Sequence, residues 1–329
     1  MNKPILSICI PTYNRAEFLS EAIESVLNQL TEDIKVEICI SDNASTDNTE
    51  ELVKKYQEKE ICNIIYHKNH ENIGADRNFL KVVEIANGEY CWYLGSDDKI
   101  SPSSINKILN EISNNKNDIY LFNREEYTMD FNHKISNSSW FNFKGDREFN
   151  FDKIEVAQYL KDVLDLGGIF SFISSIVFKK ENWDLVKNKE KYVGTLYSHT
   201  YVLTNILKQK RKLKVIDTPL VMCRINNSDN TFCGILGDYR RLYIDYYNIL
   251  IYIDIFGMDS KEVYYVKEIL LKQRNLKVLL AISLLIDDEE HKKLLLLMHN
   301  LGYYKEYMIL KIFPKRLLPI VKKIYKALK

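Results

Sequence analysis

The chain of 329 residues is long enough for two domains of ordinary size, or for one large α/β domain with an appended segment. Its 46% hydrophobic and 28% charged residues, with only 11 Gly and 6 Pro, exclude collagenous, low-complexity and disordered proteins. Lys and Arg (46) nearly balance Asp and Glu (45), which excludes a domain-wide basic surface, so no nucleic-acid partner is expected.

The first hundred residues alternate between short apolar runs and segments whose apolar residues have helical spacing. The apolar runs predict strands at residues 5–10, 36–40, 64–66 and 90–94. The helical spacing predicts helices at residues 18–30, 52–56, 79–86 and from 101 onward. Continuous apolar strands that alternate with helices predict an α/β fold, with a mostly parallel, Rossmann-like central sheet and helices on both faces.

The pattern is less regular after residue 110. Residues 113–152 are rich in Asn, Asp and aromatic residues, and only 119–123 predict a strand there. Further strands are expected at 174–178, 214–216 and 220–223, with a helix at 198–207 between them. Beyond residue 238 the sequence predicts helices rich in Tyr, Leu and Ile, so a boundary is expected near 228–240.

The cysteines and the amino terminus bear on location. Cys9, Cys39 and Cys91 lie in apolar runs and the chain has no C-x-x-C pair, which predicts buried thiols in a reducing compartment. The amino terminus has no basic segment followed by an apolar one, and apolar stretches such as residues 278–286 are shorter than the roughly 18 residues of a spanning helix. We therefore expect a cytoplasmic protein.

Three polar loops follow predicted strands, which is where open α/β sheets bind ligands. They are residues 11–15 (Pro-Thr-Tyr-Asn-Arg), 41–45 (Ser-Asp-Asn-Ala-Ser) and 95–98 (Gly-Ser-Asp-Asp). Taken alone, each has a structural explanation, because Asp and Asn are common turn residues and acidic pairs favour helix starts. Together at one sheet edge, they indicate a site for a nucleotide diphosphate and a hard divalent cation.

Four motifs follow one another between residues 7 and 98. They are Ser-Ile-Cys-Ile-Pro-Thr-Tyr-Asn-Arg (7–15), Ser-Asp-Asn-Ala-Ser-Thr-Asp (41–47), Asn72-x-Gly74-x-x-x-Asn78, and Asn-Gly-Glu-Tyr with Ser-Asp-Asp (87–98). In this order and spacing they resemble the landmarks of family 2 glycosyltransferases with the GT-A fold. The resemblance is strong over residues 4–110 and weak over 170–228.

The resemblance implies a domain organisation. A GT-A glycosyltransferase domain is expected at residues 1–230, with a nucleotide-sugar half at 1–110 and an acceptor half at 111–230. An α-helical region with a basic amphipathic end is expected at residues 231–329.

The resemblance also implies roles for loop residues. Pro11, Thr12 and Tyr13 would lie against the nucleobase and ribose, and Asp42 would accept a hydrogen bond from the base. Arg77 would approach the nucleotide from the third predicted helix.

The acidic pair carries the remaining implied roles. Asp97 would hold the ribose or the sugar. Asp98 would bind Mn²⁺ or Mg²⁺, which acts as a Lewis acid for the departing nucleotide diphosphate. Gly95 stands where the family usually has an Asp. Motifs with only the last two carboxylates also occur in the family that this chain resembles, so metal binding is still expected.

The catalytic base departs further from the family pattern. Residues 197–201 (Tyr-Ser-His-Thr-Tyr) fall where a Glu-Asp pair usually supplies the base, and they contain no carboxylate. His199 is the leading substitute, because an imidazole with an ordinary pKa near 6.5 can accept a hydroxyl proton. A purely structural explanation, a polar residue at a helix start, is equally good for His199. Asp162, Asp165 and Asp184 are alternative bases.

Two later segments complete the expected site and partners. Residues 224–228 resemble the family's closing Arg-x-His-x-x-Ser loop, with Asn226 where a histidine often contacts the metal or diphosphate. From residue 317, apolar residues at helical spacing alternate with lysines, which predicts a basic amphipathic helix. Such a helix would hold the protein at the inner face of an anionic membrane, or dock on its own domain.

The sequence favours an inverting, metal-dependent hexosyl- or deoxyhexosyltransferase. It would move a sugar from a nucleotide-diphosphate sugar, with a UDP-sugar as the first choice, to a hydroxyl of a bacterial surface glycan such as O-antigen or capsule. A polyprenyl-diphosphate-linked acceptor and an abequosyltransferase-like branch are implied by the resemblance. The alternative is a catalytically weak nucleotide-binding scaffold protein of a glycan assembly complex. A nucleotidyltransferase ranks last, because residues 11–15 contain no glycine for a phosphate loop.

Overall fold

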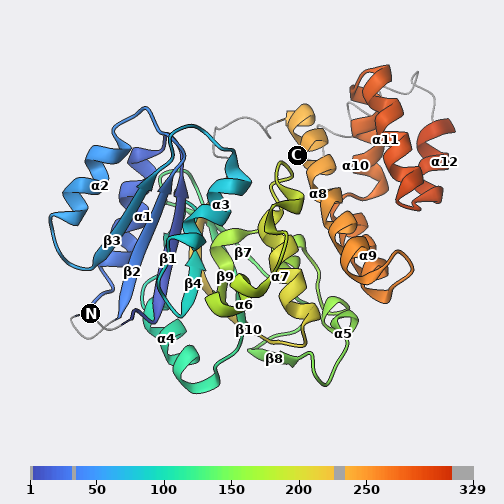
Figure 1. Ribbon diagram of the computed structural model, residues 1–329. Coiled ribbons are helices and arrows are strands. Elements are labelled where there is room, and N and C mark those ends of the chain that lie inside the picture. Colours follow the sequence, from blue (N-terminus) through green and yellow to red (C-terminus); the bar gives the residue numbers. More distant parts are fainter. Residues whose placement is uncertain (1–2, 32–34, 226–233, 313–329) are drawn as a thin grey trace. The chain divides into compact units, whose positions relative to one another are not determined.

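The computed structural model describes residues 3–31, 35–225 and 234–312 (Figure 1). Contacts between residues divide the chain into two compact units, Met1–Asn226 and Asn227–Lys329. The first unit is an α/β unit built on a single large sheet, and the second is helical over its described residues.

The sheet of the first unit is mixed. Its strands run in the order β3 (Asn63–Lys68), β2 (Val36–Asp42), β1 (Leu6–Thr12), β4 (Tyr90–Tyr93), β9 (Ile176–Lys179), β6 (Ile119–Tyr127), β10 (Lys212–Arg224) and β5 (Lys99–Ile100). The first four strands are parallel, as predicted, whereas β9 is antiparallel to both β4 and β6. The predicted α/β fold is confirmed, with a mixed sheet in place of a mostly parallel one.

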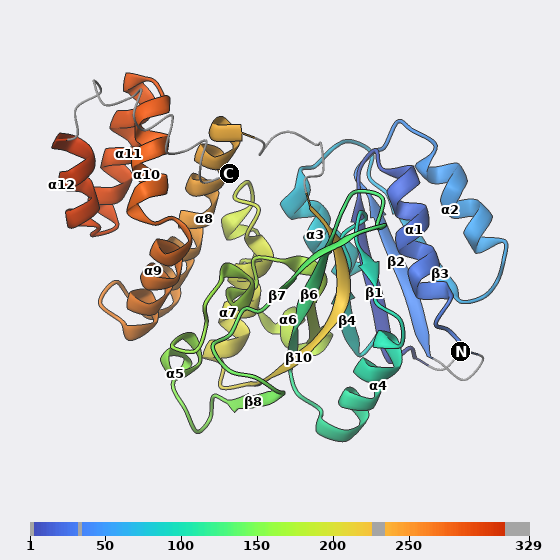
Figure 2. The ribbon, with the colours of Figure 1, turned by 180° about the vertical axis from the view of Figure 1, so that it is seen from behind.

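Helices cover both faces of this sheet (Figures 1 and 2). Side chains alternate along a strand, so Leu6, Ile8 and Ile10 of β1 point to one face, into a core with α1 (Ala16–Leu27), α2 (Thr49–Gln57) and α4 (Ser104–Asn115). The other face packs against α3 (Ala75–Glu84), α6 (Lys180–Leu185) and α7 (Ser198–Lys208). Cys9, on that face, is fully buried as predicted.

The sequence prediction was wrong in detail between residues 113 and 152. Strand β6 is longer than expected, and β7 (Lys134–Ser138) and β8 (Arg147–Asn150) add to β6 and β10. Both added strands are short, polar and at an edge, so they lack the apolar alternation that predicts a strand. The two strands expected at 214–223 are one strand, β10, with a register shift between Ile216 and Val221 around Pro219.

The second unit contains the helices predicted after residue 238. They are α8 (Gly234–Phe256), α9 (Lys261–Gln273), α10 (Leu276–Leu285), α11 (Asp288–Asn300) and α12 (Tyr304–Ile312). Inside this unit the buried carboxylate of Asp245 pairs with Arg274 at 2.7 Å. None of the described helices has the length and apolar character needed to cross a membrane. The basic helix predicted from residue 317 lies outside the described residues.

Candidate active site

The carboxyl ends of β1, β2 and β4 meet at one edge of the sheet. Thr12 and Asp42, the last residues of β1 and β2, are register partners, and the N–H of Asn43 donates to the carbonyl of Thr12 at 2.9 Å. The N–H of Leu94, just after β4, donates to the carbonyl of Cys9. The three polar loops predicted to form a site therefore lie side by side at this edge.

Two adjacent carboxylates, Asp97 and Asp98, stand in a tight turn after β4. The N–H of Asp98 donates to the carbonyl of Gly95 at 3.0 Å, which closes the turn. The Asp97 side chain is 21% exposed and pairs with Arg15, with 3.0 Å between Oδ2 and Nη1. Asp98 is only 5% exposed, and its Oδ2 accepts a hydrogen bond from Ser174 Oγ at 2.5 Å. The turn thus presents one carboxylate to solvent and holds the other inside.

The electrostatics of this turn favour a cation. Burial, and after it the charge of Asp97, raises the pKa of the Asp98 carboxyl to about 7, although Ser174 and Arg124 act in the opposite direction. In the described ranges, no three or more His, Cys, Asp or Glu side chains are arranged to hold a metal by themselves. Two carboxylates fit a hard cation such as Mg²⁺ or Mn²⁺ that takes its remaining ligands from a substrate diphosphate.

Arg224, at the end of β10, ties the carboxylate turn to two other parts of the first unit. Its Nη1 donates to the carbonyl of Asp97 at 2.6 Å, and its Nη2 pairs with Glu21 of α1 at 2.5 Å. Its Nε donates to the carbonyl of Met129, between β6 and β7, at 2.7 Å. The sequence resemblance placed Arg224 in a closing loop, and the structure shows that it anchors the backbone of the turn.

The residues expected against the nucleobase and ribose lie at the end of β1. Pro11 and Thr12 are the last residues of the strand and are buried, and Thr12 Oγ1 has no hydrogen-bond partner. Tyr13 is 43% exposed at the sheet edge. An exposed ring at this edge suits stacking on a base, and the predicted contact stays a prediction.

Asp42, expected to accept a hydrogen bond from the base, is fully buried in this structure. Its Oδ1 accepts from the N–H of Ser45 at 2.9 Å and its Oδ2 accepts from the Tyr66 hydroxyl at 2.6 Å. Asn78 of α3 donates to the carbonyls of Ser41 and Thr12 and so joins β1 to β2. These bonds give Asp42 a role in shaping the loop, and its contact with a base stays a prediction.

Two adjacent side chains of helix α3 bind the segment that leads into α7. Arg77, half exposed, pairs with Glu190 of the 3₁₀ helix η3 (Lys189–Tyr192) at 3.5 Å, and its approach to a nucleotide stays a prediction. Its neighbour Asp76 is buried and accepts from the N–H groups of Gly194, Leu196 and Ser198 at 2.8 to 3.0 Å. The sequence patterns give no signal for Asp76, because its partners are about 120 residues away.

His199 lies in the first turn of α7, and its ring is 1% exposed. Its Nε2 donates to the carbonyl of Phe170 at 2.9 Å, so the neutral ring carries its lone pair on Nδ1, which is buried without a partner. Phe79 and Tyr93 contact the ring edge to face. Burial lowers the pKa of His199 to about 4. The ring is unprotonated, as a base must be, but buried, and its catalytic role stays a prediction.

The variant His199→Gln is expected to lose less stability in mild acid than the wild type. A histidine in the unfolded chain binds a proton below pH 6.5, whereas folded His199 does so only near pH 4, so its neutral burial costs stability as pH falls through 6.5 toward 4. Between pH 7 and pH 5 the wild type should lose about 2 kcal/mol more unfolding free energy than the variant. Urea unfolding at the two pH values measures this difference, and parallel losses in the two proteins would contradict it.

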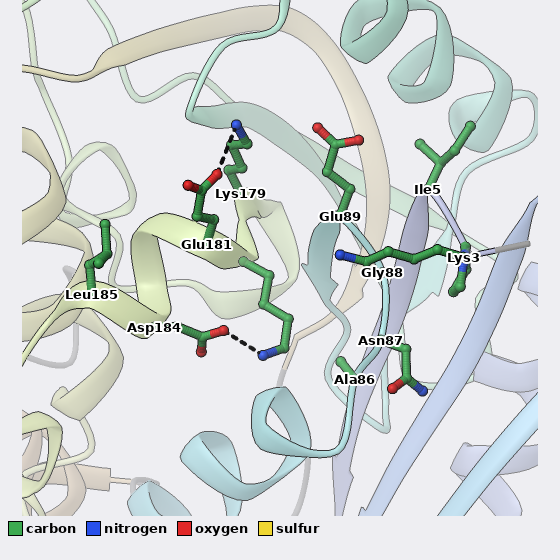
Figure 3. Close-up of a pocket in the computed structure, with 12 residues that line it drawn as sticks. Lys3, Ile5, Ala86, Asn87, Gly88, Glu89, Lys179, Glu181, Asp184 and Leu185 are labelled. Carbon is green, nitrogen blue, oxygen red and sulfur yellow. Dashed lines mark hydrogen bonds and ion pairs between the residues drawn. The ribbon is translucent and has the colours of Figure 1, made fainter.

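The alternative bases occupy other places. Asp162 pairs with Arg147 at 2.7 Å, and Asp165 accepts from the N–H of Gly167 at 3.0 Å. Asp184 pairs with Lys180 at 2.7 Å and lines a cavity of about 800 Å³ at the amino ends of β1 and β4 (Figure 3). That cavity lies at the opposite edge of the sheet from Asp98. Asn226, expected near the diphosphate, lies outside the described residues.

The fold and the paired carboxylates at the sheet edge define the class of GT-A nucleotide-sugar enzymes, and comparisons with known proteins agree. Residues 7–180 match the family described as Glycosyl transferase family 2. The chain is 39% identical to the abequosyltransferase RfbV of Salmonella typhimurium over 244 residues, which cover 74% of this chain and 72% of the relative. It is 31% identical to an uncharacterized glycosyltransferase of Methanocaldococcus jannaschii over 231 residues, covering 70% and 74%.

Solved structures show the same fold at low sequence identity. Residues 1–349 of S. aureus TarS in complex with UDP-GlcNAc match with a TM-score of 0.63 and 16% identity, over 90% of this chain and 80% of that one. The mannosyltransferase PcManGT from Pyrobaculum calidifontis in complex with GDP-Man and Mn²⁺ matches with a TM-score of 0.51 and 15% identity, over 94% and 83%. The chain belongs to glycosyltransferase family 2 and is a glycosyltransferase.

Proposed function

We propose that this chain is an inverting, divalent-metal-dependent glycosyltransferase that moves a sugar from a nucleotide-diphosphate sugar to a hydroxyl of a lipid-linked surface glycan. The observation that carries the proposal is the turn with Asp97 and Asp98 at the carboxyl edge of the sheet, joined by Arg15 to the loop that also holds Tyr13. A buried carboxylate beside a partly exposed one, with no third acidic ligand grouped with them among the described residues, suits a cation that is shared with a diphosphate.

The relatives support the donor and the metal of this proposal. TarS and PcManGT have the same fold and are solved with UDP-GlcNAc and with GDP-Man and Mn²⁺, respectively, which supports a nucleotide-sugar donor and a divalent metal. The similarity to an abequosyltransferase supports a deoxyhexose as the transferred sugar, and the surface-glycan acceptor is proposed from the sequence resemblance. A UDP-sugar is the first donor to test.

Different residues of this chain would perform different parts of the reaction. Asp98 would hold Mn²⁺ or Mg²⁺, which when bound supplies positive charge for the leaving diphosphate, and Asp97 beside it would hold the ribose or the sugar. Arg15 and Arg224 fix Asp97 by its side chain and its backbone carbonyl, respectively. A base, with His199 as the proposed group, takes the proton of the acceptor hydroxyl as its oxygen attacks the anomeric carbon. A single displacement of this kind inverts that carbon.

A thermal-shift screen tests the donor site. UDP, GDP, CDP and dTDP are each added with and without Mn²⁺, and one nucleotide is expected to raise the melting temperature only when Mn²⁺ is present. A ligand that binds the native state at a hundred times its Kd stabilises it by about 2.7 kcal/mol. Absence of a shift with every nucleotide diphosphate would overturn the donor-site assignment. Binding without any sugar turnover would favour the scaffold function instead.

The location of the enzyme is part of the same proposal. The basic segment from residue 317 is proposed to contact the anionic inner face of the cell membrane, where a polyprenyl-diphosphate-linked acceptor would lie. Its support is the sequence, in which residues 305–329 hold seven Lys and one Arg against a single Glu.

A further inference from the structure

The Ser174 hydroxyl bridges the two ends of the carboxylate turn. Ser174 is fully buried in the 3₁₀ helix η2 (Ile173–Ser175), and its partners are more than 70 residues away in the sequence. Its Oγ accepts the N–H of Gly95 at 2.8 Å and donates its only proton to Asp98 Oδ2 at 2.5 Å. One hydroxyl therefore sets both the start of the turn and the orientation of the buried carboxylate.

The position of this hydroxyl is fixed by the sheet rather than by the turn. The Ser174 carbonyl accepts a hydrogen bond from the indole N–H of Trp92 at 2.8 Å, and Trp92 is fully buried in β4. Strand β9, which follows η2 directly, pairs with β4, with Val177 opposite Trp92. Because Ser174 is held by the same strand that leads into the turn, its hydroxyl is in place before any ligand binds.

Gly95 lies close to the Ser174 hydroxyl and to both carboxylates of the turn. A Cβ on Gly95 would lie 2.8 Å from Asp98 Oδ2, 3.2 Å from Ser174 Oγ and 3.3 Å from Asp97 Oδ1. Three oxygen atoms thus crowd the place where a side chain at position 95 would begin. A side chain at position 95 would therefore displace the Asp98 carboxylate from the orientation in which Ser174 holds it.

We propose that Ser174 is a positioning residue for the metal-binding carboxylate. The serine hydroxyl donates to Oδ2 of Asp98, so the carboxylate is already oriented when a cation binds. This inference rests on the proposed function, because it requires that Asp98 binds a divalent cation. Partners that orient metal ligands in this way change metal affinity by about 10- to 100-fold when removed.

The neighbouring Ser175 provides a matched control. It lies in the same 3₁₀ helix and is also fully buried, but its Oγ has no hydrogen-bond partner. Ser174→Ala and Ser175→Ala therefore remove the same atom from adjacent positions, and only the first removes a bond to Asp98. Ser174→Thr keeps the hydroxyl and serves as the conservative variant.

Mn²⁺ titration followed by electron paramagnetic resonance, with UDP and in a parallel series with GDP, tests the proposal without an activity assay. Ser174→Ala is expected to weaken Mn²⁺ binding about 10- to 100-fold, Ser175→Ala less than about twofold, and Ser174→Thr to restore most of the affinity. Wild-type affinity in Ser174→Ala, or equal losses in both alanine variants, would overturn the inference alone. A wild type that binds no Mn²⁺ with either nucleotide would overturn the proposed metal dependence and the inference with it.

Discussion

Asp98→Asn is expected to abolish sugar transfer, with kcat reduced about 10³-fold or more, while the protein stays folded. The amide oxygen of Asn can still accept the hydrogen bond from Ser174, so the turn keeps its shape. The lost negative charge removes the main ligand proposed for the cation. The Mn²⁺-dependent part of nucleotide binding should therefore disappear together with turnover.

The same substitution is expected to stabilise the protein without ligands. Burial, and then the charge of Asp97, raises the pKa of Asp98 from its ordinary 3.8 to about 7. Between these values the folded state binds more protons than the unfolded state, so this carboxyl lowers stability as pH rises from about 4 to about 7, and the full cost is present above 7. Asp98→Asn removes that cost, and urea unfolding at pH 8 should show a gain of about 4 kcal/mol. At pH 4 the gain should vanish.

Asp184→Asn is the matched control for both measurements. Asp184 is a half-exposed carboxylate that pairs with Lys180 at the opposite edge of the sheet. This variant should keep wild-type Mn²⁺ dependence and turnover, which would also remove Asp184 from the candidate bases. If Asp98→Asn still binds nucleotide in a metal-dependent way, Asp98 is not a metal ligand. If Asp184→Asn loses turnover, Asp184 is the base.

The sequence was most informative where chemistry and local structure coincide. The strand and helix pattern up to residue 100 predicts β1, α1, β2, α2, β3, α3 and β4 correctly, because β1, β2 and β4 are buried apolar runs and amphipathic helices alternate with the strands. The loops with Tyr13, Asp42 and Asp97 are predicted to meet because parallel strands end at one edge, and the register of β1 with β2 and β4 confirms their arrangement. Their ligand contacts stay predictions.

The supporting residues of the site could not be predicted in the same way. Ser174 and Arg224 act on the carboxylate turn from η2 and β10, and their hydrogen bonds span 76 and 127 residues of sequence. A lone serine in a 3₁₀ turn or an arginine at a strand end has no local signature, since its role depends on how distant strands pair. For the same reason the burial of His199 follows from Phe79 and Tyr93, which belong to α3 and β4.

A buried polar cluster anchors the opposite edge of the sheet, at the Asn-Gly turn that leads into β4. Glu37 of β2, 2% exposed, accepts from Ser7 Oγ at 2.6 Å and from the N–H of Asn87 at 2.7 Å. The N–H of Gly88 in turn donates to Ser7 Oγ at 2.8 Å. These bonds set the register of β4 against β1, and hence the position of the carboxylate turn at the far end of β4.

Gly88→Ala is expected to destabilise the protein by about 3 kcal/mol, because overpacking costs about 1–3 kcal/mol and the buried hydrogen bond to Ser7 is lost as well. A Cβ at this position would lie 2.6 Å from Ser7 Oγ, 2.7 Å from Ser7 N and 2.8 Å from the carbonyl of Tyr90. Two of these atoms belong to the backbones of β1 and β4, so the strands would have to separate. Urea unfolding of wild type and variant measures the loss.

Gly145→Ala separates this steric effect from the general cost of replacing a glycine. Gly145 has a φ of +80° with nothing within 4 Å of the added Cβ, so only backbone strain of about 1 kcal/mol is expected there. The Gly88 variant should lose clearly more, and its Mn²⁺-dependent nucleotide binding should weaken as β4 shifts. Equal losses in the two variants would show that β1 and β4 tolerate the extra carbon, and that the Glu37 cluster does not fix the register of β4.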